Sequence, residues 1–469
     1  MSHAPPRTWI PILIRTLESG LLERDIAARL VLLAAVAGEH VLLIGPPGTA
    51  KSELARRLQA LLPAGGGYFE RLLTRFSTPE ELFGPLSLKA LEEDRYERLV
   101  QGYLPTAQVA FLDEVFKANS AILNALLSLL NERVFDNGVQ RLHVPLVTVV
   151  GASNEVPSDE ALLAFHDRFV LRVPVEPVGD AAFERLLDPA ERSPDRSPDS
   201  SADPTTLTPA LRQALMASAP AVALSASTVT ALRALREMLA HKAIRISDRR
   251  WRQFGGLLRL AAAAEGRATV EPEDLWLAAY VAAAEPAHTP ELLAWWMQAV
   301  LQVGAADAPD LQRTVEAFEK QLEIETLAQA EEGADAAGKM ALARSIGGAE
   351  GSGGGSEMLR LYSARAEEQL RKRWSPLHVR ARVAQVEEHR QRLASACSQA
   401  QAHLQHLQAR LEDRLWLPPS LAAAALAAPR ARAALLEHLL QRLQAAGQGY
   451  AALPIDEALG EMSPLPIRA

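Results

Sequence analysis

Residues 41–52 read Val-Leu-Leu-Ile-Gly-Pro-Pro-Gly-Thr-Ala-Lys-Ser, and they give the clearest indication of a fold and a function in this chain. The apolar start predicts a buried strand, the glycine and proline residues a turn, and Lys51 and Ser52 the beginning of a helix. Such a loop directs backbone N–H groups at a phosphate, Lys51 reaches the β- and γ-phosphates, and the Ser52 hydroxyl binds Mg²⁺. We therefore predict a site for ATP and Mg²⁺ over the following residues: Gly45, Pro46, Pro47, Gly48, Thr49, Ala50, Lys51 and Ser52.

One position departs from the usual phosphate-loop pattern G-x-x-x-x-G-K-[ST]. Ala50 stands where that pattern has glycine, which leaves Gly45 and Gly48 to supply the unusual backbone angles. Taken alone, the stretch also fits an ordinary turn between a strand and a helix that carries an exposed lysine. The motifs that follow it favour phosphate binding.

A second apolar run, 108–112, ends in the acidic pair Asp113 and Glu114. Ligands of parallel α/β sheets bind at the carboxyl ends of the strands, where this pair would lie. Asp113 would hold Mg²⁺ through water, and Glu114 would polarise the water that attacks the γ-phosphate. The alternative is that Asp113 only caps the next helix. The distance of about sixty residues from the phosphate loop favours the catalytic role.

A third apolar run, 146–150, leads to Asn154, and Arg168 follows fourteen residues later. The Asn154 amide can contact the γ-phosphate and orient the lytic water, although asparagine also commonly ends a strand in a turn. A single arginine such as Arg168 is usually a surface or salt-bridged residue. Before this run, Asp-Asn-Gly within alternating residues predicts a β-hairpin over 131–142.

The composition excludes several classes of protein. The chain has 469 residues and a net charge of −8, which argues against a generic nucleic-acid or anionic-membrane binder. No apolar run approaches the ~20 residues of a membrane span, and the N-terminus lacks a signal-peptide pattern. We therefore expect a cytoplasmic protein. The single cysteine, Cys397, excludes an intrachain disulfide and a cysteine-based zinc site.

In order and spacing these motifs resemble the AAA+ ATPases, and within them the MoxR branch. That branch tolerates alanine before the lysine of the phosphate loop, so Ala50 fits it. The resemblance implies that Asn154 is the first sensor and that Arg168 is the arginine finger that reaches a neighbour's ATP. It also implies that residues 87–107 are the insert in helix two and that the hairpin precedes the first sensor. Both loops tend to face the ring pore or the substrate in such ATPases.

Longer strings resemble the regulatory ATPase variant A subgroup of this branch, namely residues 74–87, 95–99, 102–105 and 246–251. The subgroup implies a hexameric ring with chaperone-like action on a protein client, beside a von Willebrand factor A-domain partner. Arg249 takes the position of the second sensor, which with Lys51 neutralises phosphate charge, and Arg250 is the reserve candidate. Relatives carry an inserted domain that docks a lysine decarboxylase. Only a short glycine-rich stretch stands there, so we do not expect that partner.

The expected fold is an α/β core with a parallel sheet over residues 1–186, an all-α lid over 209–305 and an all-α, stalk-like domain over 306–469. Polar residues rich in proline, serine and aspartate form a connection over 187–208. Glycines predict a flexible linker over 332–356.

The stalk-like domain contains a heptad pattern. From Val379 to Leu411, ten positions alternate steps of four and three residues, and Arg390 alone among them is charged. This pattern predicts a long helix packed lengthwise against others, with Cys397 buried on its seam. Partner helices nearby in the sequence favour packing within one chain over an intermolecular coiled coil.

Two functions fit these motifs. The first is a ring ATPase that hydrolyses ATP and remodels or activates a client. The second is an ATP-gated oligomeric scaffold, in which nucleotide binding and not turnover matters. Glu114 favours the enzyme, because a scaffold does not require that carboxylate. A DNA-remodelling ATPase is disfavoured by the acidic balance and by the lack of a helix-turn-helix or basic stripe.

Overall fold

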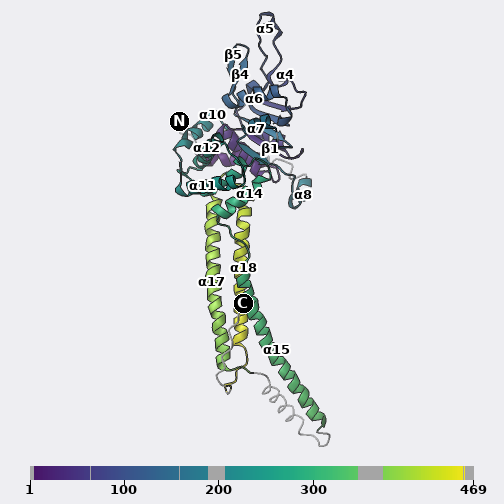
Figure 1. The fold of residues 1–469 in the computed structure, drawn as a ribbon, viewed down its shortest axis with the longest axis vertical. Coiled ribbons are helices and arrows are strands. Elements are labelled where there is room, and N and C mark those ends of the chain that lie inside the picture. Colours follow the sequence, from purple (N-terminus) through teal and green to yellow (C-terminus); the bar gives the residue numbers. More distant parts are fainter. Residues whose placement is uncertain are drawn as a thin grey trace, which may run out of the picture. The chain divides into compact units, whose positions relative to one another are not determined.

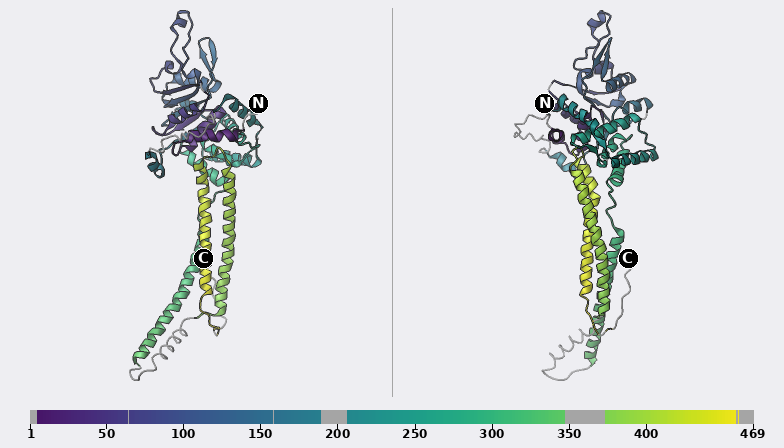
Figure 2. Two further views of the ribbon diagram at one scale, coloured as in Figure 1. Left: turned by 180° about the vertical axis from the view of Figure 1, so that it is seen from behind. Right: turned by 90° about the vertical axis from the view of Figure 1, so that its left-hand side faces the viewer.

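The computed structural model describes residues 5–63, 65–157, 159–188, 206–346 and 373–457, together with Leu459. The chain divides into two compact units, whose helices and strands are shown in Figures 1 and 2. Unit 1 consists of Met1–Val303 and Ala409–Ala425, and unit 2 of Gly304–Gln408 and Leu426–Ala469.

Unit 1 is built on a five-stranded parallel sheet with the strand order β2-β3-β6-β1-β7. The apolar runs of the sequence form its three central strands, and β1 and β6 are buried along their whole length. The sequence predicts neither β2, a half-exposed edge strand, nor β7, which has only four residues. The strands are β1 (Val41–Ile44), β2 (Gly67–Leu72), β3 (Ala107–Asp113), β6 (Thr148–Ser153) and β7 (Leu171–Pro174).

Helices cover this sheet, as expected for alternating strands and helices. The predicted hairpin is confirmed as β4 (Val134–Asn137) paired with β5 (Gln140–His143), and Gly138 turns it with a φ of 63°. Asn137 binds both the N–H and the C=O of Arg98, which joins the hairpin to the predicted insert. The helices are α1 (Pro6–Glu18), α2 (Asp25–Ala37), α3 (Lys51–Ala60), α4 (Pro79–Phe83), α5 (Leu88–Glu92), α6 (Ser120–Glu132), α7 (Glu160–His166) and α8 (Asp180–Leu187), with 3₁₀ turns at Leu104–Thr106 and Val115–Lys117.

The lid follows the core within unit 1, and Trp276 and Trp296 are buried in it. It is helical except for one parallel pair of two-residue strands, β8 (Ala223–Leu224) and β9 (Thr269–Val270). Of the predicted connection before it, residues 189–205 lie outside the described residues. The lid helices are α10 (Pro209–Ser218), α11 (Ala226–His241), α12 (Asp248–Ala264), α13 (Ala278–Val281) and α14 (His288–Trp295), with 3₁₀ turns at Ala219–Ala221 and Pro272–Leu277 and a π turn at Trp296–Val300.

One segment of the expected C-terminal domain belongs to unit 1 instead. Residues Ala409–Ala425 are held there by ion pairs and by a hydrogen bond from the Leu415 N–H to the Glu265 carboxylate at 2.7 Å. Arg414 forms salt bridges with Glu273 and Asp274, at 3.2 and 3.0 Å. The domain boundary therefore differs from the expected continuous domain over 306–469, because these charged contacts between distant residues leave no periodic signal in the sequence.

Unit 2 consists of long helices, α15 (Pro309–Ile346), most of α17 (Pro376–Glu412) and most of α18 (Pro419–Ala451). The heptad pattern is confirmed as a seam within one chain. Its residues on α17, among them Val386, Leu393 and Cys397, share a core with Phe318 of α15 and with Leu436 and Leu443 of α18. No helix in the described parts of the chain combines the length and apolarity needed to cross a bilayer.

The predicted glycine-rich linker over 332–356 is partly wrong. Helix α15 continues to Ile346, so residues 332–346 are helical. Alanine is the most frequent residue in this part of the sequence, and its high helix propensity offsets the two glycines, Gly333 and Gly338. Residues 347–356 lie outside the described residues.

Candidate nucleotide site

The predicted phosphate loop connects β1 to α3 at the carboxyl edge of the sheet. A Cβ atom on Gly45 would lie 2.1 Å from the Val175 carbonyl oxygen, so only glycine fits there. Gly48 and Ala50 both have left-handed backbone angles, with φ of 81° and 66°. Ala50 thus adopts the conformation that the usual glycine would take, at a cost of about 1 kcal/mol. The substitution leaves the turn of the loop intact.

Lys51 is folded back onto the loop that precedes it. Its Nζ donates to the carbonyl oxygens of Gly45 at 2.6 Å and Pro46 at 2.8 Å. Burial lowers the pKa of Lys51, while the charges of Asp113 and Glu114 act in the opposite direction. The ammonium group therefore already lies inside the loop, close to both acids, and can exchange carbonyl oxygens for those of a phosphate.

Arg24 supports the loop and is a residue that the sequence does not single out. Its Nε donates to the Thr49 carbonyl at 3.0 Å, and its Nη2 donates to the Glu176 carbonyl at 2.8 Å. Burial lowers its pKa. The guanidinium thereby joins the phosphate loop to the segment that follows β7. A lone arginine at the beginning of a helix gives no sequence signal for such a role.

The acidic pair and the predicted first sensor meet at the same edge. Asp113 ends β3, and its Oδ1 accepts the Glu114 N–H at 3.0 Å. Glu114 has a φ of 53°, which directs its side chain toward β6. There the Asn154 Nδ2 donates to Glu114 Oε1 at 2.7 Å, and Lys117 Nζ lies 3.3 Å from Glu114 Oε2. Because β6 lies between β3 and β1, these groups and the phosphate loop form one site.

Magnesium fits this site in the manner usual for nucleotide enzymes. Among the described residues, no group of three or more histidines, cysteines or carboxylates could hold a metal ion. Mg²⁺ in such sites keeps several waters and is bound by substrate phosphates with one or two protein oxygens. Ser52 in the first turn of α3 and Asp113 at the end of β3 are the residues that could supply those oxygens.

Arg168 lies at the opposite, amino edge of the sheet. Strands β7 and β1 are in register from Leu171 with Val41 to Pro174 with Ile44. Arg168 precedes the first of these pairs, whereas the phosphate loop follows the last. Four residues of a strand span about 10 Å, so Arg168 is separated from its own phosphate loop by more than a side chain's length.

Arg249 also lies at the amino edge, at the beginning of α12. Its Nη2 donates to Asn131 Oδ1 at 3.0 Å, and Asn131 is in the last turn of α6, just before the chain returns through the hairpin to β6. The structure therefore places Arg249 away from the phosphate loop of the same chain, which differs from the expected contact with phosphate there. The sequence could not show this, since the position depends on how the lid packs on the core.

Arg250, the reserve candidate, has a structural role. It is 2% exposed, its Nε donates to Asp167 Oδ1 at 3.0 Å, and its Nη2 donates to the carbonyls of Asp167 and Phe169, both at 3.0 Å. Its Nη1 donates to the Val281 carbonyl at 2.8 Å. Burial lowers its pKa, and Asp167 counteracts that effect. The Arg250 guanidinium therefore joins lid helix α12 to the core through hydrogen bonds. Because its N–H groups already have these acceptors, it is not available to bind a phosphate.

The core and the lid each match a protein family. Residues 10–209 match the family described as the MoxR domain in the MoxR-vWA-beta-propeller ternary systems, and residues 227–294 match the AAA lid domain. Residues 10–294 therefore form a MoxR-type AAA+ ATPase module. This finding agrees with the resemblance at the level of the MoxR branch.

The MoxR-type module also resembles parts of known proteins. An uncharacterized protein of Methanocaldococcus jannaschii is 41% identical over 260 residues, which cover 55% of this chain and 66% of that protein. A second one from the same organism is 52% identical over 171 residues, covering 36% and 45%. The matched segments thus span less than two thirds of these relatives. A solved structure from Cytophaga hutchinsonii is 18% identical, with a TM-score of 0.46, and covers 59% of this chain and 86% of its own.

Proposed function

We propose that this protein is an ATP-hydrolysing ring ATPase whose catalytic site is completed by a second copy of the chain. One observation carries the proposal. The phosphate loop, Asp113, Glu114 and Asn154 share the carboxyl edge of the sheet, whereas Arg168 and Arg249 lie at its amino edge. A site with both sets of groups requires the amino edge of one copy to meet the carboxyl edge of the next. Repetition of that head-to-tail contact closes a ring.

Within one copy, each side chain at the carboxyl edge has a distinct task. Lys51 and the loop N–H groups bind the phosphates of ATP, and Ser52 and Asp113 hold Mg²⁺, directly or through water. Bound Mg²⁺ would neutralise charge on the phosphates. Glu114 orients and polarises the attacking water. Asn154, which already donates to Glu114, holds that carboxylate in place and presents its amide toward the γ-phosphate.

The neighbouring copy supplies the positive charge that hydrolysis requires. Its Arg168 acts as the arginine finger, and its Arg249 acts as the second sensor from the lid. Arginines delivered in this way stabilise the charge that develops in the transition state, so turnover depends on assembly. We further propose the hexameric ring that is usual for the resembled subgroup.

The partners are proposed from the family. Because the matching family is described from MoxR-vWA-beta-propeller systems, we propose a von Willebrand factor A-domain partner and chaperone-like remodelling or activation of a protein client. Membership of the regulatory ATPase variant A subgroup remains a proposal that rests on the longer sequence strings. A scaffold gated by ATP binding is the second candidate, since it would use the same loop. Glu114, held by Asn154, favours turnover over that alternative.

Steady-state ATP hydrolysis by the purified chain and its Glu114→Gln variant tests the proposal, with particle mass and nucleotide affinity measured under the same conditions. We expect turnover in a ring-sized particle and a loss of about 10²–10⁴-fold in the variant, with ring mass and ATP affinity retained. If the chain binds ATP tightly but shows no hydrolysis that the Glu114→Gln change removes, the proposed enzyme is wrong and the scaffold is favoured.

A further inference from the structure

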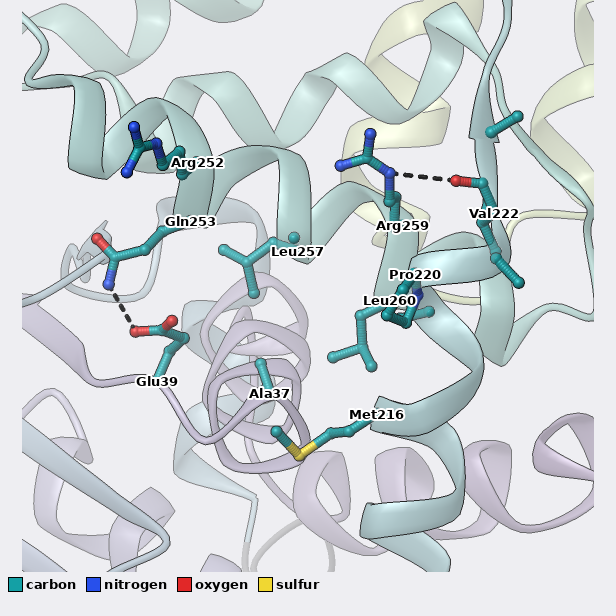
Figure 3. A pocket seen from close by; sticks show the side chains of 14 residues that line it. Ala37, Glu39, Met216, Pro220, Val222, Arg252, Gln253, Leu257, Arg259 and Leu260 are labelled. Atoms are coloured by element: carbon teal, nitrogen blue, oxygen red, sulfur yellow. Dashed lines mark hydrogen bonds between the residues drawn. The ribbon is translucent and has the colours of Figure 1, made fainter.

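A cavity of about 780 Å³ opens in unit 1 beside the predicted second sensor. Figure 3 shows its lining, with Ala37 at the end of α2 and Met216 of α10 on one side and Arg252, Gln253 and Leu257 of α12 on the other. Apolar side chains, including Met216, Leu257 and Leu260, line much of it. Its polar groups are Arg252, Arg259 and the pair in which Gln253 Nε2 donates to Glu39 Oε2 at 2.9 Å.

This cavity is continuous with the arginine edge of the core. Positions 249, 252, 253 and 256 of α12 follow the spacing i, i+3, i+4 and i+7, which puts them on one face of the helix. The three last positions line the cavity, and the first is Arg249. Glu39 lies just before β1, at the amino edge of the sheet. A copy of the chain that approached Arg249 would therefore also cover the cavity.

Helix α8 has an apolar face that is largely exposed among the described residues. Phe183 is 52% exposed, Leu186 39% and Leu187 59%, and Ala182 is the buried residue of this helix. These four residues lie on one side of the helix, whereas Ala181 and Glu184 lie on the other. Three large apolar side chains exposed on one side of a short helix indicate an interaction surface.

The base of α8 is fixed beside the phosphate loop. The Gly179 N–H donates to Glu23 Oε2 at 2.8 Å, and the neighbouring Arg24 joins the Thr49 carbonyl of the loop to the Glu176 carbonyl. Within unit 1, α8 lies on the side away from α10 and α12, as Figures 1 and 2 show. The apolar helix and the cavity therefore belong to opposite sides of the same body.

We infer that α8 of one copy docks into the cavity between Ala37, α10 and α12 of the next copy. The inference rests on the proposed site shared between copies, and it names the contact that holds the two edges together. A head-to-tail arrangement that brings Arg168 and Arg249 to a neighbour's phosphate loop also brings that neighbour's α8, anchored beside the loop, to the cavity. The charges agree, because Asp180, in the first turn of α8 beside its apolar face, would approach Arg252 and Arg259 of the cavity.

Cross-linking tests the contact directly. In the double variant Phe183→Cys/Met216→Cys, a short bismaleimide should join chain to chain and give a ladder of covalent oligomers on a denaturing gel. Each single variant should give at most dimers. The native Cys397 is buried, so the parental chain is a suitable background and control. A ring-sized particle whose double variant stays monomeric on the gel would overturn the inference.

Charge at the apolar face supplies a second test. Phe183→Asp should raise the concentration at which the ring dissociates by at least about tenfold, since it removes the burial of an aromatic side chain. Ala181→Asp is the matched control, because it adds the same charge on the opposite face of the same helix. Equal ring stability in the two variants would contradict the docking of α8.

A larger side chain on a residue that lines the cavity would fill it without a neighbouring copy. Gly256 lines it, and a Cβ atom there would have no heavy atom within 4 Å. Gly256→Phe should therefore fold normally and yet weaken the ring, whereas Gly256→Ala should leave the ring intact. The unfolding temperature of each variant shows that the fold is retained. An intact ring with Gly256→Phe would speak against occupation of the cavity by a neighbour.

These results are separable from those on the shared catalytic site. If Arg168→Ala loses turnover and no cross-link forms, the shared site stands and the α8 contact fails. If the cross-link forms and Arg168→Ala hydrolyses ATP at the parental rate, the contact stands and the role of Arg168 fails.

Discussion

The two edges of the sheet in unit 1 differ in how their functional groups are held. At the carboxyl edge, short segments that directly follow β1, β3 and β6 bring Lys51, Glu114 and Asn154 together within one chain. At the amino edge, Arg168 and Arg249 lie near groups of their own chain, and the predicted phosphate loop lies at the other edge. The carboxyl edge thus gathers most of the proposed nucleotide site within one chain, whereas the arginines of the amino edge would reach a nucleotide only in a second copy.

In the proposed ring, this difference between the edges would let assembly control hydrolysis. The groups that bind nucleotide are present in a single copy, so binding should not require a ring. In the proposed ring the groups that stabilise the transition state come from the next copy, so turnover should require a ring. Binding and catalysis are therefore expected to respond differently to changes at the two edges.

The largest expected effect is that of Arg168→Ala, which should lower turnover by about 10³-fold or more with nucleotide affinity retained. A mixing experiment with Lys51→Ala makes the comparison sharper. Each variant alone should be inactive, because one lacks the arginine and the other the phosphate ligand. An equal mixture should recover activity in up to about a quarter of the sites, since random neighbours restore both groups at that frequency.

The control for mixing is a chain that carries both substitutions, which should restore nothing when it is added to either single variant. Absence of recovery in freely exchanging rings would show that Arg168 and Lys51 act within the same copy. That result would remove the main difference between the two edges.

A comparison of the adjacent residues Arg249 and Arg250 separates function from stability. Arg249→Ala should lower turnover by about 10–10²-fold with little change in unfolding free energy, because the side chain is exposed and acts on a neighbour. Arg250→Ala should destabilise unit 1 by roughly 3–5 kcal/mol, since it removes the buried donor of the Asp167 carboxylate and of four backbone carbonyls. Urea unfolding and hydrolysis, measured on both variants, check this. Similar unfolding energies for the two would contradict the assignment.

The carboxyl edge could be predicted from the sequence, whereas the amino edge could be predicted only in part. Apolar runs that end in glycine, in an acidic pair or in asparagine give both the strand and the group at its end, so residues 45–52, Asp113, Glu114 and Asn154 follow from local pattern. Arg168 and Arg249 were found by resemblance. Their position relative to the phosphate loop depends on strand register and lid packing, which no short motif encodes.

Other parts could not be predicted, for similar reasons. Arg24 donates to the backbone carbonyls of Thr49 and Glu176. Because every residue has such a carbonyl, these contacts leave no pattern of residue types in the sequence. The segment Ala409–Ala425 belongs to unit 1 through ion pairs with residues more than a hundred positions away. The heptad seam of α17, in contrast, was predicted correctly because its packing partners repeat with the helix itself.

Arg24→Gln should have a smaller effect than the changes at the arginine edge. Loss of the donors to the Thr49 and Glu176 carbonyls loosens the phosphate loop, and we expect KM for ATP to rise by about tenfold with kcat within a few-fold of the parental value. Arg24→Lys is the control, since it keeps the charge but can bind only as a point donor. A fall in kcat with unchanged KM would mean that Arg24 acts on the transition state instead.

The smallest effect concerns the two buried histidines of the amino edge. It is a change in the free energy of unfolding that appears only in acid. His40 is buried just before β1, its Nδ1 accepts the Val149 N–H at 3.0 Å, and burial lowers its pKa to about 3. Burial also lowers the pKa of His166, just before β7, to about 3. The unfolded chain binds these protons near pH 6.5, so this stability is present above that pH and is lost as the pH falls toward 3, at up to about 1.4 kcal/mol per pH unit for each histidine. In urea unfolding between pH 5 and 7.5, His40→Gln should therefore lose less stability on acidification than the parental chain does. Equal slopes would show that His40 is not held neutral in the folded protein, and that the amino edge owes no acid sensitivity to it.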